Sequence, residues 1–470
     1  MQQNNTVRHA LKTLGLSLLV LFAYGGSSAT AQQAEPIQEP ITEPIQEPII
    51  RPKERTLLKN FHYLNNDSGE MVQADLMLIE DGIISSINQS EDNCADCTVI
   101  ELDGGYLIPG LMDLHQHLNA GGFLKETADQ KIALLRKNLY WGITTVYNPN
   151  IKLPLLREVK KAIGMNPENY PEFFSAGQNI GIKGGWGDQL VTDYQSFKIA
   201  ATRQLEAGAD NIKVSMDDMG WLSATPMAHF PEPLLRQAVA LMHVNKRRLF
   251  LHASQAKDVE VAINADVDAI IHGTVDAPLS QQTLNKLAGK NIGYVSTLIL
   301  SETISDVRNT IKEVRKFDPD LINGSTLYEN MGSELMAMNW LDWWNQSNLL
   351  KAKLPILRGN TVALVKAGGL VGIGTDSGTP SIVFGASLPY EMHLHEQIGL
   401  HPLTIIKMAS YNNAKILQID DRTGSIETGK EADLVFMRDN PTGGIKAINS
   451  MEWAMQNGAI TFRQEILGKK

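Results

Sequence analysis

The 470-residue sequence predicts an α/β protein, a (β/α)8 barrel of the TIM type with a small β-sandwich domain formed from both termini. Between residues 109 and 420, apolar strands alternate with helical segments, which indicates βα units and a parallel sheet. Eight strands can be counted: "YLIPGLMDLH", "GITTVYNP", "EFFSAGQ", "NIKVSM", "RLFLHAS", "AIIHG", "GYVSTLIL" and "LVGIGTDS". Eight such units over about 310 residues match a barrel with insertions. A doubly wound sheet is the alternative.

Near both ends of the chain, strand patterns are joined by tight-turn signals. "ADLMLIEDGIISSINQ" holds two apolar strands around Asp81-Gly82, and a second pair surrounds Asn457-Gly458. Such dipeptides are typical of β-hairpins. We therefore expect residues 54–108 and 421–470 to form the composite β-sandwich domain, with residues 109–420 as the barrel.

The first 53 residues differ from the rest of the chain. Arg8 and Lys12 precede the apolar stretch "TLGLSLLVLFAYGG", and Ala29-Thr30-Ala31 follows as a small-x-small cleavage pattern. This layout predicts a signal peptide over residues 1–31 and export to the periplasm or the medium. An uncleaved membrane anchor is the alternative. Residues 32–53 carry a proline at nearly every fourth position, which favours an extended linker.

Composition limits the class of partner. The formal net charge of −10 argues against nucleic acid and anionic membrane surfaces, and 43% of the residues are hydrophobic, as in globular proteins. Beyond the N-terminus no apolar run approaches 18 residues, so we expect no membrane association after signal cleavage. A small-molecule substrate fits this composition, and a homo-oligomer stays open.

The two cysteines, Cys94 and Cys97, stand in "NCADC". In an exported chain a local disulfide that closes a turn is the expected interpretation. A redox pair or half of a zinc site is the alternative for a cytosolic protein. Two thiolates alone do not complete a tetrahedral zinc site.

The polar residues that carry chemistry fall at the ends of the predicted strands. His115 and His117 stand two positions apart, and side chains at i and i+2 of a strand share a face. Four further candidates lie at or near the carboxyl ends of later strands: Lys213, His252, His272 and Asp376. The active sites of barrel enzymes form at this face. Imidazole and carboxylate are ligands of borderline divalent metals, so the sequence predicts a metal site.

At these positions the sequence resembles the amidohydrolase superfamily, over nearly the whole chain. The motifs are "PGLMDLHQH", "IKV", "LHAS", "IIHG", "GTDSG" and the closing "GSIETGKEADLVFM". The nearest resemblance is to the imidazolonepropionase-like, Xaa-Pro-type dipeptidase branch, in which the lysine of strand four is carboxylated. The resemblance implies a distorted (β/α)8 barrel with a small β-sandwich from both ends.

The resemblance also implies a role for each motif residue. Two divalent ions, expected to be Zn²⁺, would be held by six residues: His115, His117 and Asp376 for the more buried ion, His252 and His272 for the outer one, and Lys213 as N6-carboxylysine between them. An unmodified lysine has no acceptor and cannot be a ligand. Asp376 would also be the catalytic proton acceptor, which later protonates the leaving group.

The activity that follows is hydrolysis of an amide C–N bond, of a dipeptide or an N-acyl amino acid, by attack of a metal-bridging hydroxide. A mononuclear deaminase or cyclic-amide hydrolase of the same superfamily is an alternative, against which Lys213 argues. Esterase, lactonase or phosphotriesterase activity uses the same chemistry. A scaffold without metals is a third hypothesis, but no ligand is missing from the motifs.

Substrate contacts are the least determined part of the sequence. Four residues near the strand ends are candidates: Tyr147, Trp186, His229 and Tyr294. The glycine-rich "IGIKGGWGDQ" is expected to be a flexible lip over the site, because it lacks the Walker spacing of a phosphate loop.

Two further pairs of polar residues have less specific interpretations. Asp217 and Asp218 could bind a cationic group of a substrate, but a helix cap or solvated loop is slightly favoured. His393 and His395 repeat the two-residue spacing in a helical pattern, where i and i+2 do not share a face. We interpret these two histidines as structural.

Overall fold

The computed structural model describes residues 55–463 except 90–93, 95, 119–126, 222–225, 318–339 and 380, and describes only the backbone of residues 340–347. The predicted signal peptide and linker lie outside the described residues. Across the described part of the chain, no helix combines the length and apolar character needed to cross a membrane.

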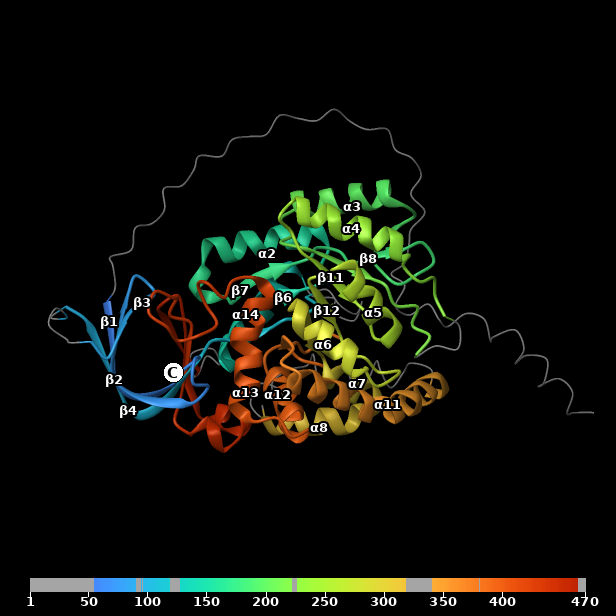
Figure 1. Cartoon of the computed structure of the whole chain (residues 1–470). Helices are drawn as coiled ribbons and strands as arrows, with labels where there is room; N and C mark the ends of the chain where they lie inside the picture. Colours follow the sequence, from blue (N-terminus) through green and yellow to red (C-terminus); the bar gives the residue numbers. More distant parts are fainter. Residues whose placement is uncertain are drawn as a thin grey trace, which may run out of the picture. The chain divides into compact units, whose positions relative to one another are not determined.

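Seven strands drawn from both ends of the chain form one sheet, in the order β17-β16-β15-β4-β1-β2-β3 (Figure 1). Their bounds are β1 (Arg55–Leu64), β2 (Met71–Glu80), β3 (Ile83–Ile87), β4 (Thr98–Pro109), β15 (Leu434–Met437), β16 (Met451–Gln456) and β17 (Ala459–Phe462). β1 and β4 pair in parallel, whereas β15 pairs antiparallel with β4. Strands from both ends share a core that includes Phe61, Met77 and the stacked rings of Phe436 and Trp453.

Both predicted hairpins of this sheet are confirmed. The turn residues have the positive φ angles of a tight hairpin turn, 52° at Asp81 and 79° at Gly82, then 48° at Asn457 and 81° at Gly458. The expected local disulfide is present between Cys94 and Cys97. Asparagine, aspartate and glycine tolerate this backbone region, which is why these dipeptides set the register of the strands on either side.

All eight predicted barrel strands are present, in two sheets. A three-stranded sheet has the order β5-β6-β7, and a seven-stranded parallel sheet has the order β14-β13-β12-β11-β10-β8-β9. The bounds are β5 (Leu111–Asp113), β6 (Ile143–Asn148), β7 (Glu172–Ser175), β8 (Ile180–Ile182), β9 (Gln189–Val191), β10 (Ile212–Ser215), β11 (Leu249–His252), β12 (Ala269–Ile271), β13 (Gly293–Ser296) and β14 (Val371–Ile373). The residues of β10 to β14 are buried throughout, as expected for strands covered on both faces.

The strand ladder is not closed into one continuous barrel, but backbone hydrogen bonds join the two sheets at both junctions. Leu114 N donates to Ile373 O at 3.1 Å, and Asp210 N donates to Ser175 O at 2.7 Å. The predicted fold class is therefore confirmed as α/β. The seven-stranded sheet drawn from both ends of the chain, here called the terminal sheet, accompanies a barrel whose strand ladder is interrupted twice. The glycine-rich segment predicted as a lip contributes β8 and β9, and β8 pairs with β10.

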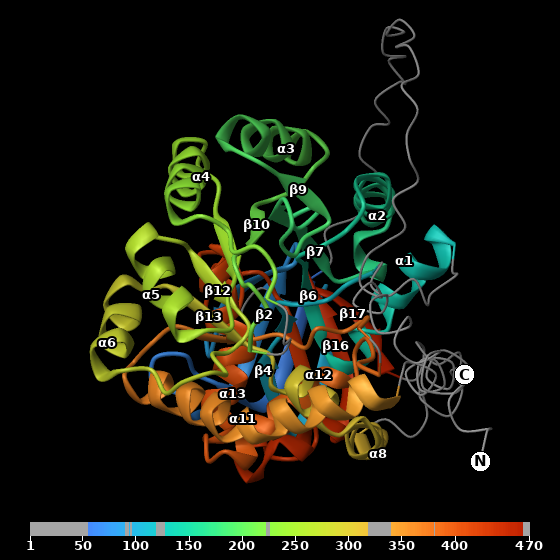
Figure 2. The same ribbon diagram turned by 90° about the vertical axis from the view of Figure 1, so that its right-hand side faces the viewer.

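Helices follow the strands and lie outside them, with α2 to α6 in succession around the parallel sheet (Figure 2). Their bounds are α1 (Ala128–Arg136), α2 (Leu153–Met165), α3 (Tyr194–Glu206), α4 (Glu232–Val244), α5 (Ala256–Ala265), α6 (Gln281–Lys290), α7 (Leu298–Ser305), α8 (Val307–Phe317), α11 (Trp340–Lys366), α12 (Ser387–Gln397), α13 (Pro402–Lys407) and α14 (Asn413–Leu417). Short 3₁₀ helices are η1 (Leu139–Trp141), η2 (Pro167–Asn169), η4 (Pro441–Gly443) and η5 (Ile445–Ser450), and η3 (Met408–Asn412) is a π-helix. Capping boxes at Thr127 and Asp193 start α1 and α3.

Candidate metal centre

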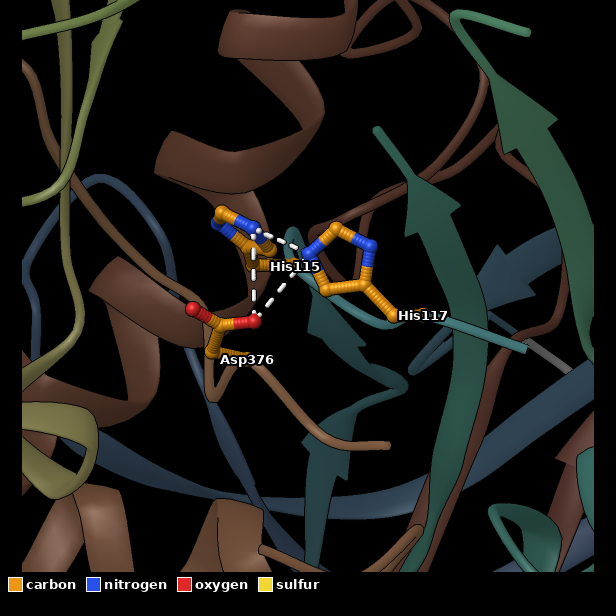
Figure 3. Close-up of side chains that lie close together, drawn as sticks. All are labelled: His115, His117 and Asp376. Carbon is orange, nitrogen blue, oxygen red and sulfur yellow. Dashed lines mark hydrogen bonds and ion pairs between the residues drawn. The ribbon is translucent and has the colours of Figure 1, made fainter. Parts of the chain in front are cut away.

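The loop after β5 and the loop after β14 are hydrogen-bonded to each other, and this brings three predicted ligands together. Asp376 N donates to His115 O at 2.7 Å, and His117 N donates to Ser377 O at 2.7 Å. His117 Nε2 lies 2.9 Å from His115 Nε2 and 3.1 Å from Asp376 Oδ1. The three side chains point toward one another, and their ligand atoms all lie within 4.8 Å (Figure 3).

The other two predicted histidines extend this group. His252 is the last residue of β11, and His272 follows β12 directly. The His272 ring centroid lies 4.7 Å from that of His115 and 4.4 Å from that of His252. The strand ends therefore bring four histidine rings into a single continuous group.

Lys213 lies in β10 and is 3% exposed. In the sheet register Ser215 stands opposite His252, and Lys213 is two residues earlier on the same face of the strand. Burial lowers the pKa of His115, His252 and His272, and the positive charge of Lys213 lowers it further. Burial lowers the pKa of Lys213 itself to about 7, against the attraction of Asp376. Burial thus favours the neutral amine, which is the form that adds carbon dioxide.

The chemistry of this donor set fits a divalent cation. His252 Nε2 and Asp376 Oδ1 are buried and have no hydrogen-bond partner among the described residues, and His115 turns its Nε2 toward His117 and Asp376. Burial lowers the pKa of His115 and His272 well below the ordinary value and that of His252 to about 4. Neutral imidazole is the metal-binding form of histidine. A cation at this position would satisfy lone pairs that the protein leaves unpaired.

Two of the predicted ligands have an unusual backbone. The φ angle is 73° at His272 and 66° at Asp376, in the left-handed region that residues other than glycine seldom adopt. Such backbone persists only where the surroundings enforce it, and it gathers at functional sites. Both residues follow the ends of parallel strands, where the chain must turn sharply toward the centre of the sheet.

A buried carboxylate that the sequence analysis missed joins the two ligand-bearing loops. Asp113 is fully buried and accepts hydrogen bonds from His115 N at 3.1 Å, Thr375 N at 2.9 Å and Thr375 Oγ1 at 2.6 Å. Gln116 Nε2 donates to its second oxygen at 2.9 Å. Burial raises the pKa of Asp113 to about 6. Its position two residues before His115, on the same strand face, was the signal that could have found it.

The first residues after β10 are held by hydrogen bonds and ion pairs. Asp217 is 1% exposed and accepts hydrogen bonds from Trp221 Nε1 at 2.8 Å and from Ser254 N at 3.1 Å. Its Oδ2 lies 3.9 Å from His252 Nε2. The interpretation of Asp217 as part of a solvated loop is therefore wrong, because its carboxylate is buried and saturated by donors. Asp218 pairs with Lys257 at 2.8 Å, and this pairing contributes to a pKa lowered to about 2.

The four candidate substrate contacts have different surroundings. The hydroxyl of Tyr147 donates to Asn211 at 2.9 Å inside the barrel, and that of Tyr294 accepts from the backbone N–H after Gly273 at 2.6 Å. Both rings are fully buried. His229 is half-buried and pairs with Asp258 at 2.7 Å, and Trp186 is half-buried in the loop between β8 and β9. Their role toward a substrate stays a prediction.

The structural interpretation of the second histidine pair is confirmed. His393 and His395 lie on α12 and have separate partners. His393 Nδ1 lies 3.0 Å from Glu396 Oε2, whereas His395 Nε2 lies 2.8 Å from Ser296 Oγ. They therefore share no ligand position.

Segments of the chain are similar to curated enzymes, and the fold as a whole is similar to solved structures. An enamidase of Eubacterium barkeri is 28% identical over 96 residues, 20% of this chain and 24% of the enamidase. A dihydroorotase of Bacillus cereus (strain G9842) is 38% identical over 107 residues, 22% of this chain and 23% of the dihydroorotase. The chain thus spans about a quarter of the length of the curated relatives it matches.

A crystal structure of a Xaa-Pro dipeptidase with bound methionine in the active site superposes with a TM-score of 0.70 and 21% identity, over 87% of this chain and all of that one. This likeness confirms the fold. The family model of the amidohydrolases matches residues 106–458, about three quarters of the sequence. That match includes every predicted metal ligand. The chain belongs to the amidohydrolase family.

Proposed function

We propose that this protein is a two-metal hydrolase that cleaves the amide bond of a dipeptide or an N-acyl amino acid. The observation that carries the proposal is the buried group of His115, His117 and Asp376, whose ligand atoms converge within 4.8 Å. The adjoining rings of His252 and His272 support a second ion beside the first. The fold likeness to a Xaa-Pro dipeptidase supports the choice of a dipeptide.

In this proposal the ligands divide between two positions. His115, His117 and Asp376 would hold the inner ion, and His252 and His272 would hold the outer ion. Lys213 would supply an anionic ligand as a carbamate, because its neutral amine can add carbon dioxide, forming one N–C bond and releasing one proton. When bound, two divalent ions lower the pKa of a water molecule and polarise a carbonyl group. Zn²⁺ suits the nitrogen-rich donor set.

The remaining chemistry belongs to the side chains. Asp376 accepts the proton of the attacking water and passes it to the leaving amine. The hydrogen bond from Asp376 N to His115 O and the left-handed backbone at Asp376 fix where this carboxylate stands. Asp217 keeps the loops after β10 and β11 together beside His252 and so limits how the outer part of the site can relax.

A second candidate is hydrolysis of a cyclic amide or imide. The segments similar to an enamidase and to dihydroorotases favour testing it, and dihydroorotate belongs in the substrate panel for that reason. Esters and lactones belong there as well, because the same nucleophile attacks any polarised carbonyl.

The test combines metal content with a substrate screen. Purified protein should hold two divalent ions per chain and should hydrolyse dipeptides or N-acyl amino acids in preference to dihydroorotate. His115→Ala and His252→Ala should each reduce kcat/KM by at least about a thousandfold, because loss of a ligand costs several kcal/mol of transition-state stabilisation. His243→Ala is the matched control, because His243 of α4 pairs with Asp268, the residue before β12, away from the cluster. Full amidase activity in metal-free protein would contradict the proposal.

A further inference from the structure

Helix α12 carries two buried polar side chains one helical turn apart, Glu391 and His395. Both are 0% exposed, and neither belongs to the group of predicted ligands. α12 packs against α7, the helix that follows β13. Buried ionisable groups are costly unless they are well paired, so the contacts of these two residues indicate what they are for.

Glu391 holds the beginning of α7. Its Oε1 accepts from Leu298 N at 2.9 Å and its Oε2 accepts from Ile299 N at 2.6 Å. The first N–H groups of a helix have no partner within the helix, and a carboxylate from another helix satisfies two of them here. The contact fixes the backbone immediately after the end of β13.

His395 contacts Ser296, the residue that directly precedes Thr297 in the chain. Its Nδ1 lies 2.8 Å from Glu391 O, and a carbonyl oxygen only accepts, so Nδ1 carries the proton. Burial lowers the pKa of His395 to about 4, so the ring is neutral. Nε2 is then free to accept from the hydroxyl of Ser296 at 2.8 Å. Ser296, His395 and Glu391 follow the order of a nucleophile, base and acid, but Ser296 is fully buried and the carboxylate of Glu391 accepts from two backbone N–H groups of α7.

Thr297 lies between Ser296, which contacts His395, and Leu298, whose N–H donates to Glu391. It is 2% exposed, and its Oγ1 lies 2.9 Å from Nδ1 of His272. A histidine that binds a metal through one ring nitrogen usually donates its other N–H to a fixed acceptor, which sets the tautomer and the ring orientation. Thr297 meets this requirement for His272, whose ring faces those of His115 and His252.

We propose that Thr297 is a positioning residue that orients His272 for the outer ion, and that Glu391 and His395 of α12 hold Thr297 in place. The inference rests on the proposed function, in which His272 is a ligand. It connects helix α12, which lies outside the group of strand ends, to the position of the outer ion. The inner ion, held by His115, His117 and Asp376, does not depend on this connection.

The test replaces the acceptor and measures metal binding. In Thr297→Val a methyl group replaces the hydroxyl, and the outer ion should bind roughly 10- to 100-fold more weakly by chelator competition, the range seen when such a partner is removed. The visible spectrum of the cobalt-substituted protein should change for one ion only. Thr297→Ser keeps the hydroxyl and should restore both affinity and spectrum.

Thr303→Val is the matched control, because Thr303 is also a buried threonine of this segment and donates only to Ile299 O within α7. It should bind both ions as the wild type does, and the melting temperatures of the two metal-free valine variants should be similar. Glu391→Gln retains one acceptor oxygen but sets an N–H group against a helix N–H. It should also weaken the binding of the outer ion and leave the affinity for the inner ion unchanged.

The outcomes separate the inference from the function on which it rests. If His272→Ala loses the outer ion while Thr297→Val and Glu391→Gln keep wild-type affinity, the positioning role is wrong and the two-metal proposal stands. If His272→Ala still binds both ions tightly, the assignment of His272 as a ligand is wrong, and the positioning role falls with it.

Discussion

Lys213 is the least expected side chain of the centre, because it is a buried amine in the strand that pairs with the one bearing His252. Lys213 is 3% exposed, and burial brings its pKa to about 7. A charged ammonium there would repel any cation that the histidines bind. The proposed carbamate form would reverse the sign of this charge and so favour metal binding.

We predict that Lys213→Ala loses the second metal and the activity together, and that propionate or another short carboxylic acid restores part of both. Lys213→Arg should not recover either, because guanidinium stays protonated and cannot be an anionic ligand. Metal content and kcat/KM are measured side by side, with Lys290→Ala, whose amine pairs with Asp266 on the surface, as the control. Bicarbonate should speed the reconstitution of metal-free protein. A Lys213→Arg protein with two metals and normal turnover would refute the bridge.

At the scale of single residues, the sequence predicted the metal ligands but did not predict the residues that position them. His115, His117 and Asp376 stand in motifs whose spacing at strand ends predicted their convergence. Thr297 escaped notice because a single polar residue after an apolar strand has no periodic signature, and Asp113 escaped notice although it stands two residues before His115 on the same strand face. Their importance depends on contacts with residues distant in sequence, such as Thr375 and His272.

Among the elements, the strands of the barrel were the most predictable. Each is a short apolar run between helices, and all eight occur where the pattern placed them. β8 and β9 were missed, because three-residue strands within a glycine-rich segment resemble a loop. Gly181 shows why the segment pairs closely, since a side chain there would run into the backbone of Trp186.

The end of β14 allows a sharp test of how the elements fix the centre. A Cβ at Gly374 would lie 2.8 Å from His115 Cβ and 3.0 Å from His115 N. We predict that Gly374→Ala pushes the two ligand-bearing loops apart, lowers the free energy of unfolding by about 1–3 kcal/mol and weakens metal retention.

The matched control for this variant is Gly289→Ala in α6, where a Cβ meets nothing within 4 Å. That change should leave metal content unaltered and stabilise the protein slightly, because alanine restricts the unfolded chain. Thermal unfolding and metal analysis of both variants provide the comparison. Equal metal retention in Gly374→Ala and the wild type would show that the loops can separate without cost.

For the molecule as a whole, stability should depend on a carboxylate of the terminal sheet. Asp433 is 6% exposed, accepts from Asn457 N at 2.8 Å and from Thr423 Oγ1 at 2.7 Å, and burial raises its pKa from 3.8 to about 6. A raised folded-state pKa means that the folded protein favours the protonated acid. This residue therefore adds stability as the pH falls from about 6 toward 4, by up to about 3 kcal/mol.

We predict that Asp433→Asn unfolds at a higher temperature than the wild type at pH 7, and that the difference shrinks as the pH approaches 4. The amide oxygen still accepts from Asn457 N, and no buried charge forms. Melting temperatures across this range are compared with those of Asp439→Asn, an exposed aspartate of the same sheet region. A constant difference between Asp433→Asn and the wild type at every pH would contradict the assignment.

Export concerns the entire chain, and the proposal is that residues 1–31 direct it to the periplasm or the medium. A protein that begins at Gln32 should fold and bind metal, because the sheets and the ligands all lie beyond residue 54. The N-terminus of the mature protein, sequenced from its host, decides the question. Mature protein that still begins at Met1 and is recovered from the cytoplasm would rule out export.

The strand order of the terminal sheet also determines which strand pairings can form while the chain is still being synthesised. β4 lies between β1 and β15, so one of its edges stays unpaired until Leu434–Met437 has been made. About 325 residues separate these neighbours, which takes roughly 15 to 65 s at about 5–20 residues per second. Throughout that time the nascent chain presents an open strand edge, which other chains can join. Because β4 runs through Gly110 into β5, the loop that bears His115 gains its final anchor only when the last strands arrive.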